Sequence, residues 1–276
     1  MATGGLRGYP PPMRARLPRT VIRLRGEGMA GWLDGLLTNN VQADAPTFAA
    51  LLSPQGKILA DMVVTPDSGG FLLDTPEAMG AGLLQRLRMY VLRAPITVED
   101  VSATHDVEAV WDDGAADEAA EGQPDPRHPS LGVRRIGPVE ESGNLSDNLA
   151  AYDRHRLSLG VPDSQFDFGP GEMFPHDAAM DELHGLDLKK GCFVGQEVVS
   201  RMARLSTVRK RIRTVLLQGG AEAGDTLEAG ARRVGDILHV NGDMASVLVR
   251  LDRLEGAATG LTVNGAPASV MGGPNG

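Results

Sequence analysis

Apolar and polar positions alternate in short blocks through the first part of the chain. Residues 20–25 place apolar side chains between arginines as a half-buried strand does, and the apolar stretch at 29–37 predicts a short helix. Apolar runs at 48–52 and 57–64 flank Ser53-Pro54-Gln55-Gly56, whose Pro and Gly have the placement of a tight turn. These two runs predict a β-hairpin.

The same reading predicts further elements downstream. Strands are expected at 71–74 and 94–101, and helices at 76–89, 149–160 and 196–205. The first of these helices begins with a proline, which suits a first helical turn, and the second ends at a glycine. Strands and helices therefore mix along this part of the chain.

The C-terminal part has a different character, with short apolar runs between glycine turns. These runs lie at 212–217, 237–240, 245–251 and 268–271. They predict a small all-β domain, most simply a barrel. Together with the mixed region before it, this makes an α+β chain.

We divide the chain on this basis into a disordered tail at 1–17, an α+β region at 18–205 and the barrel at 206–276. Residues 1–25 contain six arginines and no acid, which superficially resembles a transit peptide. The first serine comes only at Ser53, however, and the strand-like pattern at 20–25 argues for structure. The expectation is therefore a cytoplasmic protein without a targeting signal.

Composition narrows the possible functions. The formal net charge of −9 argues against a general nucleic-acid binder, because phosphate contacts need clustered Lys and Arg. No apolar run reaches the length of a membrane span. The single cysteine excludes an intramolecular disulfide, and because iron–sulfur clusters usually need four thiolates, the chain alone is no ordinary cluster scaffold.

Acidic residues concentrate at 106–127, where eight acids stand against one arginine. This composition disfavours packing and predicts a solvated insertion loop. The alternative is an acidic surface that docks a basic partner.

The most specific motif is the stretch Lys189-Lys190-Gly191-Cys192-Phe193-Val194-Gly195-Gln196-Glu197. Six specified positions in the window 190–197 would recur by chance on the order of 10⁻⁸ per start site at average residue usage. The window holds the only cysteine and lies directly before a predicted helix.

This stretch resembles the signature of the YgfZ-type folate-binding proteins, which are implicated in iron–sulfur protein maintenance and are relatives of the glycine cleavage aminomethyltransferase. Other blocks are similar to that family as well, at 31–41, 51–61 and 174–181. The resemblance implies an aminomethyltransferase-like fold of two interleaved α+β subdomains plus a C-terminal β-barrel. It also implies that tetrahydrofolate, or a derivative, binds in a central opening.

Cys192 is the predicted chemical group. Lys190 and a nearby helix N-terminus would favour its thiolate, and the glycine at Gly195 permits a tight turn beside it. A free cysteine is more often a small buried hydrophobe. The thiol could pass a cluster, share one across a dimer or form a transient adduct, and the residues alone do not choose among these.

Gln196 and Glu197 can donate to and accept from a pterin ring, or they can brace the loop that carries the cysteine. Arg201 belongs to a local basic stretch that either is solvated or receives the glutamate tail of a folate. We therefore take Gln196, Glu197, Gly195 and Arg201 as the candidate folate contacts. No metal site is expected.

Asp61 bears on catalysis. The aminomethyltransferase branch has an Asp-Asp pair at the end of the matching hairpin, whereas this chain has Ala60-Asp61. The resemblance therefore favours an accessory factor that binds folate and supports assembly or repair of iron–sulfur enzymes. The alternatives are a folate-dependent one-carbon transferase that uses Asp61, and a non-catalytic adaptor. The expected partners are folate and iron–sulfur client or assembly proteins, without nucleic acid or membrane, and the chain is expected to be a monomer or weak dimer.

Overall fold

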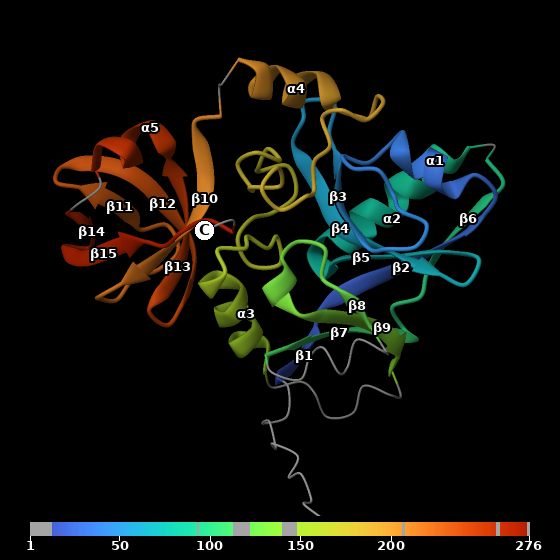
Figure 1. Ribbon diagram of the computed structural model, residues 1–276, viewed down its shortest axis with the longest axis horizontal. Helices are drawn as coiled ribbons and strands as arrows, with labels where there is room; N and C mark the ends of the chain where they lie inside the picture. Colours follow the sequence, from blue (N-terminus) through green and yellow to red (C-terminus); the bar gives the residue numbers. More distant parts are fainter. Residues whose placement is uncertain are drawn as a thin grey trace, which may run out of the picture.

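The computed structural model describes residues 13–92, 94–112, 122–139, 148–205, 208–257 and 260–274. The strands of these residues form two β-sheets and a closed barrel, with the barrel to one side of the sheets and the loop-rich segment 161–187 between them (Figure 1). The predicted α+β fold with two interleaved subdomains and a C-terminal barrel is thereby confirmed.

The larger sheet has five strands in the order β3-β4-β5-β2-β6. Its strands are β2 (Arg19–Gly26), β3 (Thr47–Leu52), β4 (Ile58–Asp67), β5 (Gly70–Pro76) and β6 (Ile96–Asp100). The predicted hairpin is formed by β3 and β4, and its turn contains Gly56 at a φ of 81°, a conformation that favours glycine.

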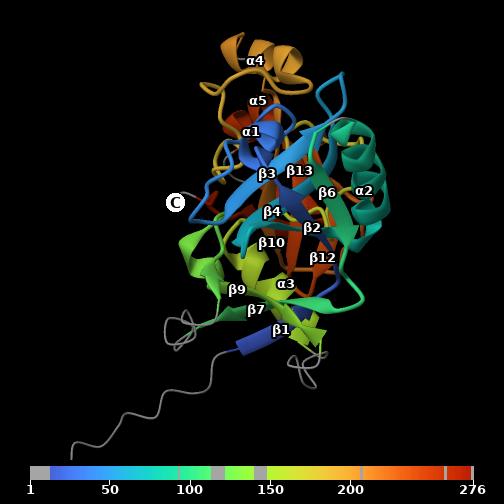
Figure 2. The ribbon, with the colours of Figure 1, turned by 90° about the vertical axis from the view of Figure 1, so that its right-hand side faces the viewer.

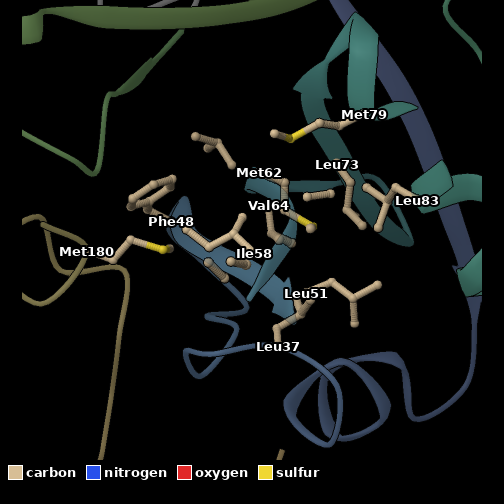
Figure 3. Close-up of a cluster of buried hydrophobic side chains, with 14 of the residues drawn as sticks. Leu37, Phe48, Leu51, Ile58, Met62, Val64, Leu73, Met79, Leu83 and Met180 are labelled. Carbon is tan, nitrogen blue, oxygen red and sulfur yellow. The ribbon is translucent and has the colours of Figure 1, made fainter. Parts of the chain in front are cut away.

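Side chains cover this sheet from more than one direction, which explains why every residue of β3 is buried. Met79 and Leu83 reach the sheet from α2 (Glu77–Val91), while Met180 of the 161–187 segment lies beside Phe48 (Figure 3). The short helix α1 (Met29–Asp34) follows β2. The resulting cluster of buried side chains is the main hydrophobic core of the chain.

The smaller sheet has the order β1-β7-β9-β8. Its strands are β1 (Met13–Leu17), β7 (His105–Trp111), β8 (Gln123–Pro124) and β9 (Val133–Pro138). The two sheets are interleaved because β1 pairs with β7 in one sheet, whereas β2, which follows after Pro18 alone, pairs with β5 and β6 in the other.

Two expectations about loops are wrong over part of their length. Residues 13–17 of the expected disordered tail form β1, and 1–12 lie outside the described residues. Residues 106–111 of the expected acidic loop belong to β7, and 113–121 lie outside the described residues.

The acids of β7 are buried because neighbouring strands supply arginines. Glu108 pairs with Arg14 of β1 and Arg135 of β9, each at 3.3 Å, and Asp106 pairs with Arg16. These partners are distant in the sequence, so composition alone suggested solvation where the fold provides charge pairing.

The barrel closes in the order β10-β13-β12-β11-β14-β15. Its strands are β10 (Lys210–Leu217), β11 (Thr226–Ala229), β12 (Arg232–Asn241), β13 (Met244–Arg250), β14 (Leu261–Val263) and β15 (Ala266–Val270). It has a hydrophobic core of its own, and the short helix α5 (Leu251–Leu254) follows β13 (Figure 1). Because the barrel is closed, its sheet has no free edges.

The helix α3 (Leu149–Ser158) lies between the barrel and the smaller sheet and contacts both (Figure 1). Its Asp153 accepts hydrogen bonds from His239 and Asn241 of β12, both at 2.7 Å. Arg156 donates to Asp167 at 2.9 Å, and Asp167 also accepts from Ser246 of β13 at 2.7 Å. Polar contacts therefore fix the barrel against α3 and the 161–187 segment.

A second buried polar network joins the two sheets. Arg134 of β9 pairs with Asp74 of β5 at 2.6 Å and with Asp125 at 3.1 Å. Arg127 pairs with Asp125 at 2.8 Å and with Asp163 at 2.7 Å. Removing one member of such a buried set costs about 3–5 kcal/mol, because its partner keeps an uncompensated charge.

None of the helices in the described part of the chain combines the length and the apolar character that crossing a bilayer requires.

Candidate functional site

The stretch 189–197 forms a loop that is fastened at both ends. At its start, the ammonium of Lys190 donates to the backbone carbonyls of Asp34 and Leu37 at 2.8 Å and of Asn39 at 3.0 Å. These carbonyls lie at and just beyond the end of α1, where helical acceptors lack intrahelical partners. Burial lowers the pKa of Lys190, and the carboxylates of Asp34 and Asp187 oppose that shift.

Lys190 therefore holds the loop against α1, a role that its sequence neighbours did not reveal. All its described polar contacts are with backbone carbonyls, and its ammonium lies 5.4 Å from the centroid of the Phe193 ring. Its expected support for the Cys192 thiolate stays a prediction.

The segment 38–40, which follows α1, supports the same loop. Thr38 donates from its hydroxyl to the Gly185 carbonyl at 2.6 Å and accepts from the amide of Ala50 in β3 at 2.8 Å. Its own carbonyl accepts from the amide of Asp187 at 2.9 Å, and the side chain of Asn40 donates to the Asp187 carboxylate at 3.0 Å. The segment leading into the loop is thus attached to the main core.

At the other end, Gly195 packs against the β3–β4 hairpin. It has a φ of 79°, and a Cβ at this position would lie 2.6 Å from the Ser53 carbonyl oxygen and 3.1 Å from the Leu52 Cβ. Only glycine meets both the backbone conformation and this close approach. The predicted folate contact Gly195 is therefore placed in a packed junction.

Between these two attachments, Cys192 is exposed. The next residue, Phe193, is buried in the main core, with 6% of its surface exposed. The side chain of Phe193 thus anchors the loop directly beside the thiol, and the thiol is presented to solvent on a fixed backbone.

The remaining candidate folate contacts lie on α4 (Gln196–Arg204), which stands at the edge of the molecule and leads into β10 (Figures 1 and 2). Gln196, Glu197 and Arg201 line a surface groove with a volume of about 570 Å³, here called the α4 groove. Its other lining residues are Leu188, Ser200, Arg204 and Leu205.

Glu197 and Arg201 form an ion pair at 3.7 Å, with side chains 90% and 71% exposed. An exposed pair of this kind contributes little to stability. Three of the four candidate folate contacts, Gln196, Glu197 and Arg201, thus line one groove, whereas Gly195 belongs to the loop that precedes α4.

Asp61 is separate from the 189–197 loop and lies within β4. Only 6% of it is exposed, and its carboxylate accepts a hydrogen bond from the Ser164 hydroxyl. Burial raises its pKa, and the negative charge of Asp163 adds to this effect, while Arg19 and Arg127 oppose it. No hydrogen bond or ion pair among the described residues joins Asp61 to the 189–197 loop.

The surroundings of Asp61 are the part of this region that the sequence did not predict. Ser164 and Asp163 come from the 161–187 segment, and Arg127 is the one arginine of the acid-rich stretch 106–127. That isolated arginine was the available signal, since a single basic residue among acids often has a buried partner. Among the described residues, no group of three or more His, Cys, Asp or Glu is arranged to hold a metal ion.

Comparison with known proteins gives this site a context. Residues 209–271 match the family of the CAF17 C-terminal β-barrel domain. The iron–sulfur cluster assembly factor IBA57 homologue of Mycosarcoma maydis is 30% identical over 224 residues, which cover 72% of this chain and 55% of that protein. Human IBA57 is 28% identical, with coverage of 86% of this chain and 77% of the human protein.

The chain is similar in sequence to the IBA57-type iron–sulfur cluster assembly factors. The 189–197 stretch resembles the signature of the YgfZ-type proteins, whereas these relatives carry the name IBA57. The chain spans 55% of the length of the M. maydis relative.

The fold has a solved counterpart in aminomethyltransferase T of the glycine cleavage system from Bartonella henselae. The TM-score is 0.75 at 18% sequence identity, and the match covers 96% of this chain and 86% of that one. This likeness establishes the aminomethyltransferase-like fold and nothing further about activity.

The expectation of a cytoplasmic protein is wrong. The IBA57 relatives from M. maydis, Pyricularia oryzae and human are all named as mitochondrial proteins. A single cysteine is in keeping with a reducing environment and does not distinguish one such compartment from another.

Proposed function

We propose that this chain supports the assembly or repair of iron–sulfur proteins, with Cys192 as the group that contacts the cluster or the client. The observation that carries this proposal is the exposed Cys192 thiol on a loop fixed by Lys190 and Gly195. The IBA57 relatives are named as iron–sulfur cluster assembly factors, and this supports an iron–sulfur cluster as the group that the thiol meets. A structural cysteine would instead be expected among core side chains.

The cluster in this proposal is cargo. Because clusters are usually held by four ligands and the chain contains one cysteine, Cys192 supplies one ligand and a client or assembly protein supplies the others. The fixed backbone around Cys192 holds the sulfur in one position while the partner approaches. The chain acts as a monomer or weak dimer in this role.

The proposal is tested in a strain that lacks the gene, by rescue with wild type or with Cys192→Ala. Wild type is expected to restore the activity of an iron–sulfur enzyme under oxidative stress, whereas Cys192→Ala restores less than about a tenth of that activity. Because Cys192 is exposed, the variant should unfold at the same urea concentration as wild type. Equal rescue by both proteins would show that the thiol is dispensable.

Tetrahydrofolate binding is a separate part of the proposal, supported by the resemblance to YgfZ-type folate-binding proteins. The four candidate contacts do not form an enclosed pterin site: Gly195 is packed against the hairpin, and the side chain of Glu197 is 90% exposed. Arg201 and Gln196 fit a carboxylate tail better than a ring. No step of the proposed function therefore runs through folate, and titration calorimetry with tetrahydrofolate tests binding directly.

One observation favours a second function, a folate-dependent one-carbon transferase that uses Asp61. A buried carboxyl with a raised pKa is a candidate for proton transfer. Formation of methylenetetrahydrofolate from an aminomethyl donor by wild type, and its loss in Asp61→Asn, would support this function. For the adaptor function through 106–127, Asp106 and Glu108 are not available to a partner because they are buried in β7, while 113–121 lie outside the described residues.

A further inference from the structure

The α4 groove lies in a region whose charge is opposite to that of the whole chain. Residues 187–210 contain six basic and two acidic side chains, while the chain has a formal net charge of −9. Lys189, Arg201, Arg204, Arg209 and Lys210 are all exposed. A local positive surface on an acidic protein attracts acidic partners and steers their approach.

The arginines of the groove are free to meet such a partner. Arg204 makes no ion pair or hydrogen bond with any residue that the structure describes. Arg201 has only its 3.7 Å contact with the exposed Glu197 carboxylate, which competes with solvent. By contrast, Arg211 and Arg213 further along the chain are paired with Asp181 and Glu182.

Apolar side chains border the same groove. Leu205 is 64% exposed and Leu188 is 37% exposed, and they are two of the four large apolar side chains that the described residues expose. An apolar contact surrounded by charged groups is the usual composition of a protein–protein contact surface.

The position of the groove relates it to the thiol. Leu188 and Gln196 both line the groove, and Cys192 lies between them on the same loop. Cys192 is four positions from each of these two residues, which places its backbone within about 14 Å of theirs, so a bound segment of several residues can extend from the groove to the exposed sulfur.

We propose that the α4 groove binds an acidic segment of a partner protein through Arg201 and Arg204, with an apolar side chain of that segment against Leu188 and Leu205. Binding there presents the partner's own thiol or cluster ligand to Cys192. This inference deepens the proposed function, since it names the chemistry of the partner that the thiol meets.

A protein segment fits the groove better than the other anionic ligands. None of the described residues that line the groove is aromatic, so a pterin or a nucleobase finds no aromatic ring on which to stack there. Glu197 also places a carboxylate among the arginines, which disfavours a phosphate backbone and can pair with a basic residue within a mixed peptide.

The test uses the reaction of Cys192 with two synthetic peptides that share their leucines and one cysteine, the latter activated as a 2-thiopyridyl disulfide. One peptide carries glutamates and the other carries lysines at the same positions. The Cys192 thiolate attacks the peptide sulfur, a protein–peptide disulfide forms, and 2-thiopyridone leaves and is measured by its absorbance. At low ionic strength the acidic peptide is expected to react about tenfold faster.

Charge reversal identifies the surface responsible. Arg201→Glu/Arg204→Glu should invert the preference, so that the lysine peptide reacts faster, and Leu205→Gln should slow both peptides several-fold. The matched control is Arg86→Glu/Arg88→Glu on α2, which changes the net charge equally and should keep the wild-type preference. Neutral dipyridyl disulfide should react at one rate with every variant, which shows that the thiol itself is unchanged.

Equal rates for the two peptides, or an equal effect of the α2 control, would overturn the docking inference. If tetrahydrofolate abolished the preference for the acidic peptide, the groove would be assigned to folate and the docking inference would also be overturned. These readouts do not depend on iron–sulfur enzyme activity. The proposed function can therefore fail in the rescue experiment while the docking inference stands, and the reverse also holds.

Discussion

At the residue scale, the loop around Cys192 shows how a charged side chain acts through distant partners. In the sequence Lys190 stands two positions before Cys192, and this proximity suggested electrostatic support for the thiolate. In the structure the ammonium is satisfied by carbonyls about 150 positions earlier, with Asp34 separated from it by 156 residues. The sequence marked the residue as important, and its contacts depended on the tertiary fold.

Replacement of Lys190 by methionine should reduce the free energy of unfolding by about 2 kcal/mol, because three carbonyls lose a charged donor. Urea unfolding measures this loss. Lys189→Met is the matched control: its side chain is exposed, so a change below about 0.5 kcal/mol is expected. Equal losses in the two variants would mean that the Lys190 contacts do not stabilise the loop.

At the element scale, α4 is seated on the β3–β4 hairpin through two glycines. Gly56 in the hairpin turn approaches Val198 of α4, and Gly195 at the start of α4 approaches Ser53. The hairpin itself was predictable, since Pro54 and Gly56 have the spacing of a tight turn. Its contact with α4, 142 positions later in the chain, was not, because no local pattern encodes it.

Gly195→Ala should be clearly destabilising, by about 1–3 kcal/mol, since the new Cβ would meet the Ser53 carbonyl at 2.6 Å and the residue has a φ of 79°. It should also disturb the loop and change the rate at which iodoacetamide alkylates Cys192. Gly191→Ala makes a suitable comparison, because a Cβ there meets nothing within 4 Å. Thermal unfolding and alkylation of both variants should separate them, and identical behaviour would contradict the tight packing at Gly195.

The strands of the smaller sheet, by contrast, could not be predicted from patterns in the sequence. The larger sheet, α2 and the barrel follow apolar periodicity and glycine turns, so their existence was predictable. In β1 and β7, arginines and acids occupy positions that look solvated, but the acids Asp106 and Glu108 are buried and pair with arginines across the strands. Charge pairing between remote strands leaves no periodic signal in either one.

At the scale of the whole molecule, buried ion pairs join the two sheets and make stability depend on pH. Burial opposes ionisation of Asp125, but the charges of Arg127 and Arg134 outweigh it and lower its pKa to about 2. Arginine neighbours lower the pKa of Asp74 and Asp163 as well, against the effect of burial, whereas burial raises that of Asp61.

Because these lowered pKa values favour the ionised carboxylates in the folded state, the stability they contribute is full above about pH 4 and is lost as the pH falls toward 2. Asp125 alone accounts for about 2 kcal/mol of this loss. Uptake of a proton by Asp61 in the folded state offsets a small part of the loss.

Urea unfolding between pH 7 and pH 2.5 tests this dependence. Asp125→Asn should be less stable than wild type at pH 7, by about 3 kcal/mol, since Arg127 and Arg134 lose a charged partner. Its stability should fall less steeply with acid, because one titrating group is gone. Parallel pH profiles for the two proteins would show that Asp125 is not held ionised by the arginines.

The candidate site stays a prediction, and only parts of its geometry could be anticipated. The 189–197 stretch singled out a loop on which the structure exposes a thiol, and three of the four candidate folate contacts line one groove. The charge of that groove was visible in the sequence as a basic stretch. Its apolar border was not, since Leu188 and Leu205 look like ordinary core residues until their exposure is known.

The interleaved sheets also govern the order in which the chain can be completed. β1 pairs with β7 and β2 pairs with β5 and β6, so each of these two strands is synthesised before any of its partners. Met13, for example, finds Trp111 as its neighbour. Pairings between such distant positions form slowly, because a long loop must close, at a cost in chain entropy, before the hydrogen bonds between the strands can form. Strands that leave the ribosome early are thus among the last to be locked in place, and until then their unpaired edges are open to misassembly.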